Sequence, residues 1–576
     1  MVSQDSGNKK LFTFIKNKKC ENSGIAPLKE NGNLHGDPKT KAKLLNSQFS
    51  SVFSTDNTSN IPDLGTSQYN EAPQITVTQN GVYKLLHGLN QHKATGPDEI
   101  STKFLKEMAA PVTPALTLIF QASFNQGQTP DDWKLANISP IFKKGDKSKP
   151  ANYRPVSLTS VCCKVIEHII HSHLMKFFED QNILTDYQHG FRKKRSCESQ
   201  LITTIQDLAS GIDSSTQIDA ILLDFSKAFD KVSREQLAAK LHHYGVRGPT
   251  LNWIKSFLAG RTQRVIVEGV ASDTAPVTSG VPQGTVLGPL LFLIYINDLP
   301  SKVNSTARLF ADDCLLYRHI KTNEDTTSLQ DDLNNLQYWE RDWQMHFNPD
   351  KCEVIRITTK RKIIPSSYFI HGKELNITSK GKYLGITISQ NLSWNNHIDN
   401  VCRKANNTTA FLRRNLSSCP ANMRTKCYTT FVRPQLEYAS SVWAPHTQSN
   451  INKLELVQRR AARFATGNYN TTSSVTTMLN HLNWDTLQQR RLRTKAIMMY
   501  RIINGLVAIE PPPFMHHLGA ATRGQQHKYI VPCSRTTVHK ESFFPSTIQL
   551  WNQLPEATAA ALDLESFKKE IQAVRF

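Results

Sequence analysis

Two adjacent carboxylates, Asp312 and Asp313, stand between two short apolar runs of the sequence. This pattern predicts two β-strands joined by a tight turn, with both aspartates at the turn. Neighbouring carboxylates repel each other unless a cation lies between them, and a divalent metal ion is the natural occupant. The pair alone leaves a second interpretation open, because aspartate is also common in turns for its local hydrogen bonds.

A third carboxylate, Asp224, ends the apolar run that begins at Ala220 and precedes Phe225. A helix is predicted from about Ser233, so Asp224 lies between a buried strand and a helix. Catalytic groups often collect at the ends of buried strands. A helix-capping aspartate is the alternative at this position.

A basic hairpin is predicted between residues 136 and 158. Its turn carries Lys143 and Lys144, and its second strand carries Arg154. Lysine offers a point charge and arginine a bidentate fork, which together suit a triphosphate. An exposed charged hairpin without a ligand is the alternative.

Two further segments have residue types that suit a ligand. The loop 278–284 contains Gln283 and Gly284 and leads into a very apolar helix. Its glycines permit a ligand to approach the backbone, and Gln283 offers donors and an acceptor. The basic segment 188–196 opens another helix and either faces a template phosphate or is a solvated turn.

The composition indicates a globular chain with an anionic partner. The 576 residues are 39% hydrophobic and 20% charged, and the formal net charge is +21. Nucleic acid and an anionic membrane both fit this charge. The longest apolar run, residues 286–296, is about half a bilayer span, and the first residues are not a signal peptide, so no membrane partner is expected.

The ten cysteines form no Cys-x-x-Cys pair and no zinc-type cluster with histidine. This usage is typical of a reducing compartment. A cytoplasmic or nuclear location, or both, is therefore expected.

The order of these pieces resembles the reverse transcriptases of non-LTR (LINE-type) retrotransposons, jockey-like elements in particular. The matching motifs are Asp224–Asp230, Ser279–Gly284 and Phe310–Asp313. The resemblance is close over residues 93–388 and less specific beyond them. Phe310 stands where many relatives carry tyrosine, which keeps the ring and loses only a hydroxyl.

The resemblance implies an α+β right-hand polymerase fold. Residues 93–388 would form the fingers and a ferredoxin-like palm, and residues 389–505 a helical thumb. Residues 1–92 would be a polar basic leader, either partly disordered or an RNA-binding arm, with Lys9, Lys10, Lys16, Lys18 and Lys19 close together. Residues 506–576 would be a small C-terminal extension of unassigned role.

The resemblance also implies an activity and its parts. The chain would be an RNA-directed DNA polymerase that adds dNTPs to a DNA primer on an RNA template, with no obligate protein partner. Two Mg²⁺ ions, or Mn²⁺, would be held by the carboxylates of Asp224, Asp312 and Asp313 and the backbone carbonyl of Phe225. The remaining site residues would be Lys143, Lys144 and Arg154 on the triphosphate, Phe229 as the steric gate against a ribose 2′-hydroxyl, Gln283 and Gly284 beside the nucleotide, and Lys351 as general acid toward pyrophosphate.

The arginines of the thumb segment recur on predicted helices, where they would grip the template–primer backbone or form a solvated face. They are Arg403, Arg413, Arg414, Arg459, Arg460, Arg463, Arg490, Arg491 and Arg493. Two other functions stay open: a decayed or domesticated copy that only binds RNA, and an RNA-dependent RNA polymerase, which Phe229 opposes. Because the first ninety residues are too few for an endonuclease, the polymerase portion of an element or a truncated copy is expected.

Overall fold

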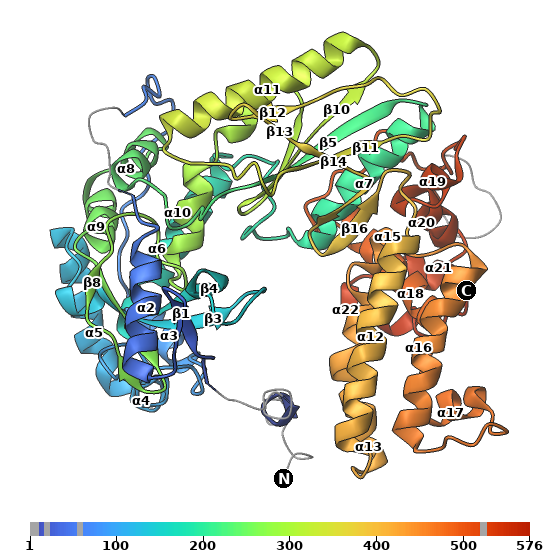
Figure 1. Cartoon of the computed structure of the whole chain (residues 1–576), viewed down its shortest axis with the longest axis horizontal. Helices are drawn as coiled ribbons and strands as arrows, with labels where there is room; N and C mark the ends of the chain where they lie inside the picture. Colours follow the sequence, from blue (N-terminus) through green and yellow to red (C-terminus); the bar gives the residue numbers. More distant parts are fainter. Residues whose placement is uncertain (1–10, 16–23, 55–60, 519–526) are drawn as a thin grey trace.

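The computed structural model describes residues 11–15, 24–54, 61–518 and 527–576. In Figure 1 a sheet lying under α11 forms the upper part of the molecule, and one body extends below it on each side. We call the upper part the palm, the body with residues 24–180 and 234–276 the fingers, and the helical body with residues 395–503 the thumb. This mixed helix and sheet architecture has the three parts that the sequence predicted.

The palm is a five-stranded sheet with the strand order β14-β11-β5-β10-β9. Along the chain its elements follow strand, helices, hairpin, helix and strand, the order of the βαββαβ unit predicted for the palm. The bounds are β5 (Gln217–Asp224), β9 (Thr306–Phe310), β10 (Asp313–Ile320), β11 (Glu353–Ile357), β14 (Asn376–Thr378), α7 (Cys197–Asp213), α10 (Leu287–Tyr295), η3 (Leu299–Lys302) and α11 (Asn323–Asp342), with the small hairpins β12 (Phe369–Ile370)–β13 (Lys373–Glu374) and β15 (Lys380–Tyr383)–β16 (Ile386–Ser389).

Both faces of the palm sheet are covered, which accounts for the continuous apolar runs of its strands. Successive side chains of a strand point to opposite faces. Ile221 and Leu223 of β5 therefore join the core that includes α10 and α11. Ile218 and Ala220 join a second core with α7, the β15–β16 hairpin and the thumb. The sheet is thus held between two cores up to the edge where β5 ends at Asp224 and β10 begins at Asp313.

The fingers surround a second sheet, with the order β4-β3-β6-β7 and β8 paired to β6. Residues 102–126 form two helices, α4 and α5, which are divided at Met108. The bounds are β1 (Leu28–Glu30), β2 (Asn33–His35), β3 (Leu135–Phe142), β4 (Tyr153–Leu158), β6 (Thr262–Val267), β7 (Val270–Ala271), β8 (Ala275–Pro276), α2 (Pro38–Ser50), α3 (Gln79–His87), α4 (Thr102–Glu107), α5 (Ala109–Gln126), η1 (Asp131–Trp133), η2 (Pro150–Asn152), α6 (Val161–Asp180), α8 (Arg234–His243) and α9 (Gly248–Leu258).

The boundary predicted at residue 92 does not divide the structure. Val82 and Leu86 of α3 are fully buried in the same core as α5 and α6. In α2, Lys41 Nζ lies 2.7 Å from Glu268 Oε1 in the turn between β6 and β7. The segment looks polar because its few apolar residues are spread over short elements that pack one face each. The lysines at 9, 10, 16, 18 and 19 lie outside the described residues.

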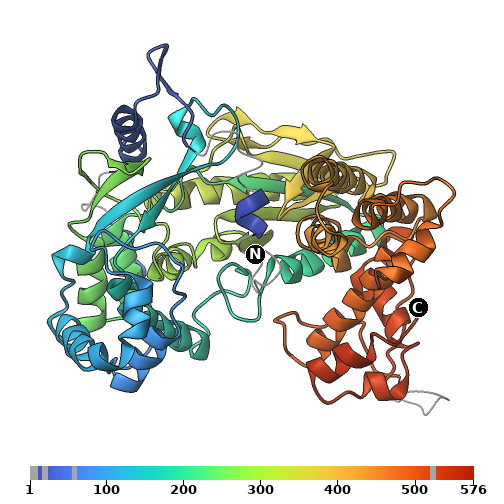
Figure 2. The ribbon, with the colours of Figure 1, turned by 90° about the horizontal axis from the view of Figure 1, so that it is seen from below.

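Residues 11–15 form a helical turn, and Leu11 and Ile15 of this turn are buried in the core that the thumb shares. The Phe12 ring meets Phe431 of the thumb edge-on, with 4.5 Å between ring centroids. Figures 1 and 2 place this turn between the fingers and the thumb.

The thumb is helical, and its long helices α12 and α16 run side by side (Figure 1). Its bounds are α12 (Asn395–Leu416), α13 (Ala421–Cys427), the π-helical turn η4 (Tyr428–Val432), α14 (Arg433–Glu437), α15 (Ser440–Trp443), α16 (Gln448–Thr466), α17 (Val475–His481) and α18 (Leu487–Ile503).

The C-terminal residues do not form a separate unit. They hold α19 (Thr537–Lys540), α20 (Phe543–Trp551), α21 (Glu556–Ala559) and α22 (Leu564–Glu570). Ile548 and Trp551 pack with Tyr500 of α18, and Phe544 lies in the core shared by palm and thumb. No helix in the described part of the chain combines the length and the apolar character that crossing a bilayer requires.

Candidate active site

Three carboxylates from distant parts of the sequence meet at one end of the palm sheet. Strands β5 and β10 are antiparallel neighbours, and Asp313 lies directly opposite Asp224. Directly opposed residues of such strands have Cα atoms about 4.5–5.5 Å apart. Asp312 occupies the turn that precedes β10. The prediction that both aspartates lie in the turn holds for Asp312 alone: Asp313 is the first residue of β10, because it pairs with Phe310 and closes a two-residue turn.

The turn itself needs support, because Ala311 has a φ of +52°. Two-residue hairpin turns commonly require positive φ values, which suit glycine and asparagine better than alanine. Gln188, which is only 2% exposed, holds this conformation. Its Oε1 accepts hydrogen bonds from the backbone N–H of Ala311 (2.9 Å) and of Gly190 (2.7 Å), and its Nε2 donates to the Ala311 carbonyl at 3.3 Å.

The segment around Gln188 is therefore part of the site. Leu309 N donates to the Tyr187 carbonyl and His189 N to the Leu309 carbonyl, each at 2.9 Å, so the segment lies along the edge of β9. A Cβ on Gly190 would lie 2.3 Å from the Ala311 nitrogen, which explains the glycine. Sequence reasoning considered a template contact or a solvated turn here and missed this contact, although Gln-x-Gly before a capped helix is a visible signal.

The charges of the three carboxylates act on one another. Dehydration within the site raises the pKa of Asp313 to about 6, and the negative charges of Asp312 and Asp224 act in the same direction. The positive charge of Lys143 opposes this rise. Lys351 Nζ donates to Asp224 Oδ2 at 2.9 Å, which brings this predicted residue into the site. The donors at this end of the sheet are oxygens only, a set that suits hard divalent cations.

The backbone of Asp224 and Phe225 is fixed from behind. Asn348 N donates to the Asp224 carbonyl and Ser226 N to the His346 carbonyl, each at 2.8 Å. The buried Phe225 ring stacks on Phe347, with 4.3 Å between centroids. Neither backbone bond uses the Phe225 carbonyl, which was predicted as a metal ligand.

Phe229 and the loop 279–284 form one packed unit. Val281 N donates to the Phe229 carbonyl, and Gln283 Nε2 donates to Asp230 Oδ1, each at 2.9 Å. The Phe229 ring stacks on Phe292 of α10 with 4.4 Å between centroids. The half-buried Phe229 ring is thus held in place on the side that α10 covers.

The same loop is joined to the strand that carries Arg154. Ser157 N of β4 donates to the Gln283 carbonyl at 2.8 Å. Gly284 has a φ of +111°, and a Cβ there would lie 2.6 Å from the Ser157 carbonyl oxygen. Only glycine fits this approach.

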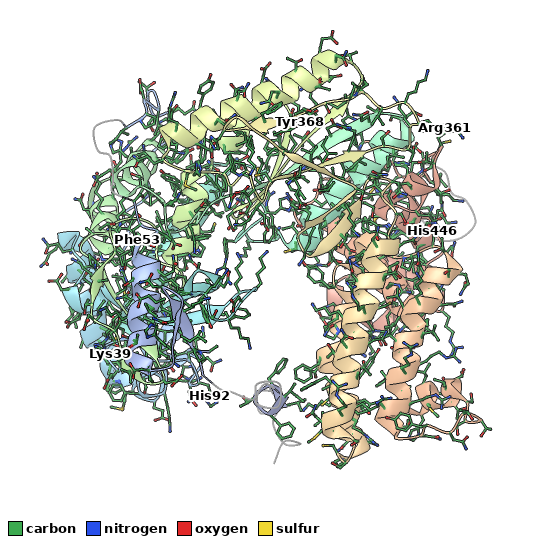
Figure 3. The ribbon with its side chains drawn as sticks, viewed as in Figure 1. Lys39, Phe53, His92, Arg361, Tyr368 and His446 are labelled. Carbon is green, nitrogen blue, oxygen red and sulfur yellow. The ribbon has the colours of Figure 1, made fainter. Side chains whose placement is uncertain are left out.

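The predicted basic hairpin projects toward the space between fingers and thumb (Figures 1 and 3). Arg154 lies opposite Ile141, and Lys143 N donates to the Asn152 carbonyl at 2.9 Å. Lys143, Lys144 and Arg154 are exposed and form no ion pair within the described part of the chain. Burial lowers the pKa of Lys227, and the positive charges of Lys143, Lys351 and Arg154 lower it further, so these cations share one region.

A buried carboxylate that sequence reasoning missed caps the start of α10, the helix that follows the loop 279–284. Glu167 of α6 is fully buried, and its Oε2 accepts from Val286 N at 2.6 Å and Leu287 N at 3.0 Å. A carboxylate at a helix N-terminus satisfies free N–H groups and complements the helix dipole. The one carboxylate within the largely apolar residues 161–170 was the available signal.

The thumb arginines divide into two groups. Those of α12 and α16 point outward: Arg403, Arg413, Arg414, Arg459 and Arg460 are exposed, and Arg463 is half-buried. Those of α18 point inward. Arg490 pairs with Glu437, Arg493 pairs with Asp485 at 2.6 Å, and Arg491 is only 2% exposed.

Comparison with known proteins agrees with this geometry. Residues 141–388 match the family described as reverse transcriptase (RNA-dependent DNA polymerase). The chain is 29% identical over 388 residues to a probable RNA-directed DNA polymerase from transposon X-element of Drosophila melanogaster, covering 66% of this chain and 42% of that protein. It is 28% identical over 413 residues to the RNA-directed DNA polymerase from mobile element jockey of the same species, covering 69% and 44%. The chain thus spans less than half the length of these relatives.

Proposed function

Since the chain carries a reverse transcriptase domain related to those of non-LTR retrotransposons, we propose that it is an RNA-directed DNA polymerase. It would extend a DNA primer along an RNA template with dNTPs. The observation that carries the proposal is the pairing of Asp224 with Asp313 beside the turn that holds Asp312. This geometry brings together the carboxylates of two separate motifs, as nucleotidyl transfer requires.

Reverse transcriptases generally use divalent metal ions, and the all-oxygen donor set at the palm supports Mg²⁺ here, with Mn²⁺ as a substitute. The carboxylates of Asp224, Asp312 and Asp313 and the carbonyl of Phe225 would hold two ions. When bound, the ions activate the primer 3′-hydroxyl and neutralise charge on the triphosphate. The chain's contribution is to keep the three carboxylates close together against their dehydration and their mutual repulsion, which both raise the pKa of Asp313.

The exposed cations of the β3–β4 hairpin would bind the triphosphate. Arg154 supplies a bidentate fork, and Lys143 and Lys144 supply point charges. Lys351, which donates a hydrogen bond to Asp224, would give a proton to the departing pyrophosphate.

Sugar and base would meet the unit of Phe229 and the loop 279–284. The stacked Phe229 ring cannot turn away easily, so it would exclude a ribose 2′-hydroxyl by contact. Gln283 and Gly284 would lie beside the nucleotide. The hydrogen bond that the Gln283 carbonyl accepts from Ser157 N of β4 would fix the sugar position relative to Arg154.

The outward arginines of α12 and α16 would bind the backbone of the template–primer duplex. We do not assign this role to Arg490, Arg491 or Arg493, because α18 directs them into the protein.

Primer extension on an RNA template tests the proposal. With Mg²⁺ and dNTPs the purified chain should extend a DNA primer, and rNTPs should be used poorly. Intact binding of template–primer without any extension would favour a protein that only binds RNA. Efficient use of rNTPs would instead indicate an RNA polymerase.

A further inference from the structure

A second group of metal-binding side chains lies behind the palm. Glu340 comes from the last turn of α11, His346 from the loop that follows, and His371 from the turn between β12 and β13. One ligand atom from each lies within 4.8 Å of the other two. His371 Nε2 is 3.2 Å from Glu340 Oε2, and His346 Nδ1 is 3.8 Å from Glu340 Oε1.

The carboxylate of Glu340 is the buried member of this group, with a side chain only 2% exposed. Phe347 N donates to its Oε1, whereas its Oε2 accepts no hydrogen bond from the residues that the structure describes. Burial raises the pKa of Glu340 to about 7, despite the Phe347 N–H and the charge of Lys231. A buried carboxylate oxygen that accepts no hydrogen bond is costly unless a cation lies beside it, and His371 Nε2 is 3.2 Å from this one.

The two histidines are held at the edge of this carboxylate and remain open to solvent. Their rings stack with 4.6 Å between centroids, and their side chains are 50% and 34% exposed. The backbone N–H of His371 donates to Gln337 Oε1 of α11 at 2.7 Å, which fastens the β12–β13 turn to the helix. Tyr368, which is labelled in Figure 3, is buried in the core that includes α11 and anchors the start of this hairpin.

We propose that Glu340, His346 and His371 bind a zinc ion. Two imidazoles and one carboxylate are a ligand set that zinc uses in proteins, with bonds of about 2.0–2.2 Å. Ligands at that distance in a tetrahedron are about 3.3–3.6 Å from one another. His371 Nε2, at 3.2 Å from Glu340 Oε2, is close to this value, whereas the 3.8 Å of His346 Nδ1 is measured to the other oxygen, Oε1, so the exposed His346 ring must rotate toward Oε2 to complete the site. Water would take the fourth position.

The proposed site differs in chemical class from the carboxylates of Asp224, Asp312 and Asp313. Nitrogen-containing sets favour zinc and related transition metals, whereas sets of oxygen alone favour Mg²⁺. Excess Mg²⁺ therefore fills the site of Asp224, Asp312 and Asp313 without displacing zinc from Glu340, His346 and His371. This difference allows the two sites to be measured separately in one protein.

A bound zinc ion would brace the back of the palm. It would join α11 to the β12–β13 hairpin and to the loop 346–348, whose backbone bonds hold Asp224 and Ser226. We therefore expect zinc to raise the melting temperature of the full chain.

Metal analysis of the purified full chain, dialysed in excess Mg²⁺ with trace zinc, tests the proposal. We expect one zinc ion per chain, and a tetrahedral visible spectrum after replacement by Co²⁺. His371→Asn and Glu340→Gln should each weaken zinc binding by more than about 100-fold, because loss of a direct ligand exceeds the 10–100-fold effect of changing a residue that only hydrogen-bonds to a ligand. Asparagine tolerates the φ of +53° at position 371, and glutamine keeps an oxygen for Phe347 N, so both variants should fold.

His446→Asn is the matched control, because His446 is an exposed histidine of the thumb, between α15 and α16 (Figure 3). It should leave zinc content, cobalt spectrum and melting temperature unchanged. Zinc content equal in wild type, His371→Asn and Glu340→Gln, or no stoichiometric zinc in the wild type, would overturn the proposal. The group would then be a carboxylate–histidine ion pair without a metal.

Discussion

Replacing Gln188 by methionine tests whether this buried amide positions the catalytic turn. Methionine keeps the length of the side chain but removes its hydrogen bonds to Gly190 and Ala311. Three buried backbone groups lose their partner, and each such loss costs about 1–3 kcal/mol. Because the turn relaxes, we expect a total loss of about 2–4 kcal/mol in unfolding free energy, below the sum of the three.

The effect on catalysis should be larger than the effect on folding. Ala311 precedes Asp312, so release of its positive φ moves the carboxylate. A displacement of about 1 Å in a catalytic group costs about 100-fold in rate. We therefore expect single-nucleotide incorporation by Gln188→Met to fall about 100-fold, with template–primer binding within about threefold of wild type.

Gln200→Met provides the matched control. Gln200 is equally buried, and its Nε2 donates to the Tyr383 hydroxyl at 3.2 Å rather than to the backbone of the turn. It should lower stability by about 1 kcal/mol and leave the incorporation rate nearly unchanged. Equal incorporation rates for Gln188→Met and Gln200→Met would refute the positioning role.

Three further substitutions test other parts of the site. Gly284→Ala should raise the KM for dNTP about tenfold or more, because its Cβ would lie 2.6 Å from the Ser157 carbonyl. The control Gly269→Ala, also at positive φ but in open space, should leave this KM unchanged, and steady-state kinetics distinguish the two variants. Phe229→Val should allow rNTP incorporation without loss of dNTP use, measured as the ratio of the two kcat/KM values, and an unchanged ratio would remove the gate assignment. Without divalent ions, Asp313→Asn should raise the melting temperature at pH 7.5, because the folded pKa of Asp313 (about 6) lies above the ordinary 3.8. The contribution of the Asp313 carboxyl group to folding stability is therefore complete below pH 3.8 and is lost as pH rises through 6. Solvent screening reduces the full effect of about 3 kcal/mol to about 1 kcal/mol, and the difference in melting temperature should shrink at pH 5.

The catalytic carboxylates were predictable because residue type and periodicity are local signals. Apolar runs that end in aspartate predicted β5 and the β9–β10 hairpin, and both are present. Ser196 and Ser233 were correctly expected at the starts of helices. Each of these inferences needed only a window of a few residues.

The supporting residues were not predictable in this way. Gln188 and Glu167 act on backbone groups more than a hundred residues away, at Ala311 and Val286, and no spacing in the sequence announces such partners. The residues before position 92 and after position 505 look polar for a related reason. Their apolar side chains are sparse, but several of them, such as Val82, Leu86, Ile548 and Trp551, fill places in cores that other segments build.

The most direct test of the account is single-turnover nucleotide incorporation by Asp313→Asn, compared with Asp331→Asn. Asp331 is an exposed aspartate of α11, away from the three carboxylates. With Mg²⁺, an RNA template and a DNA primer, we expect Asp331→Asn to match wild type and Asp313→Asn to show no measurable incorporation, while both bind template–primer normally. Incorporation by Asp313→Asn at the wild-type rate would contradict the account.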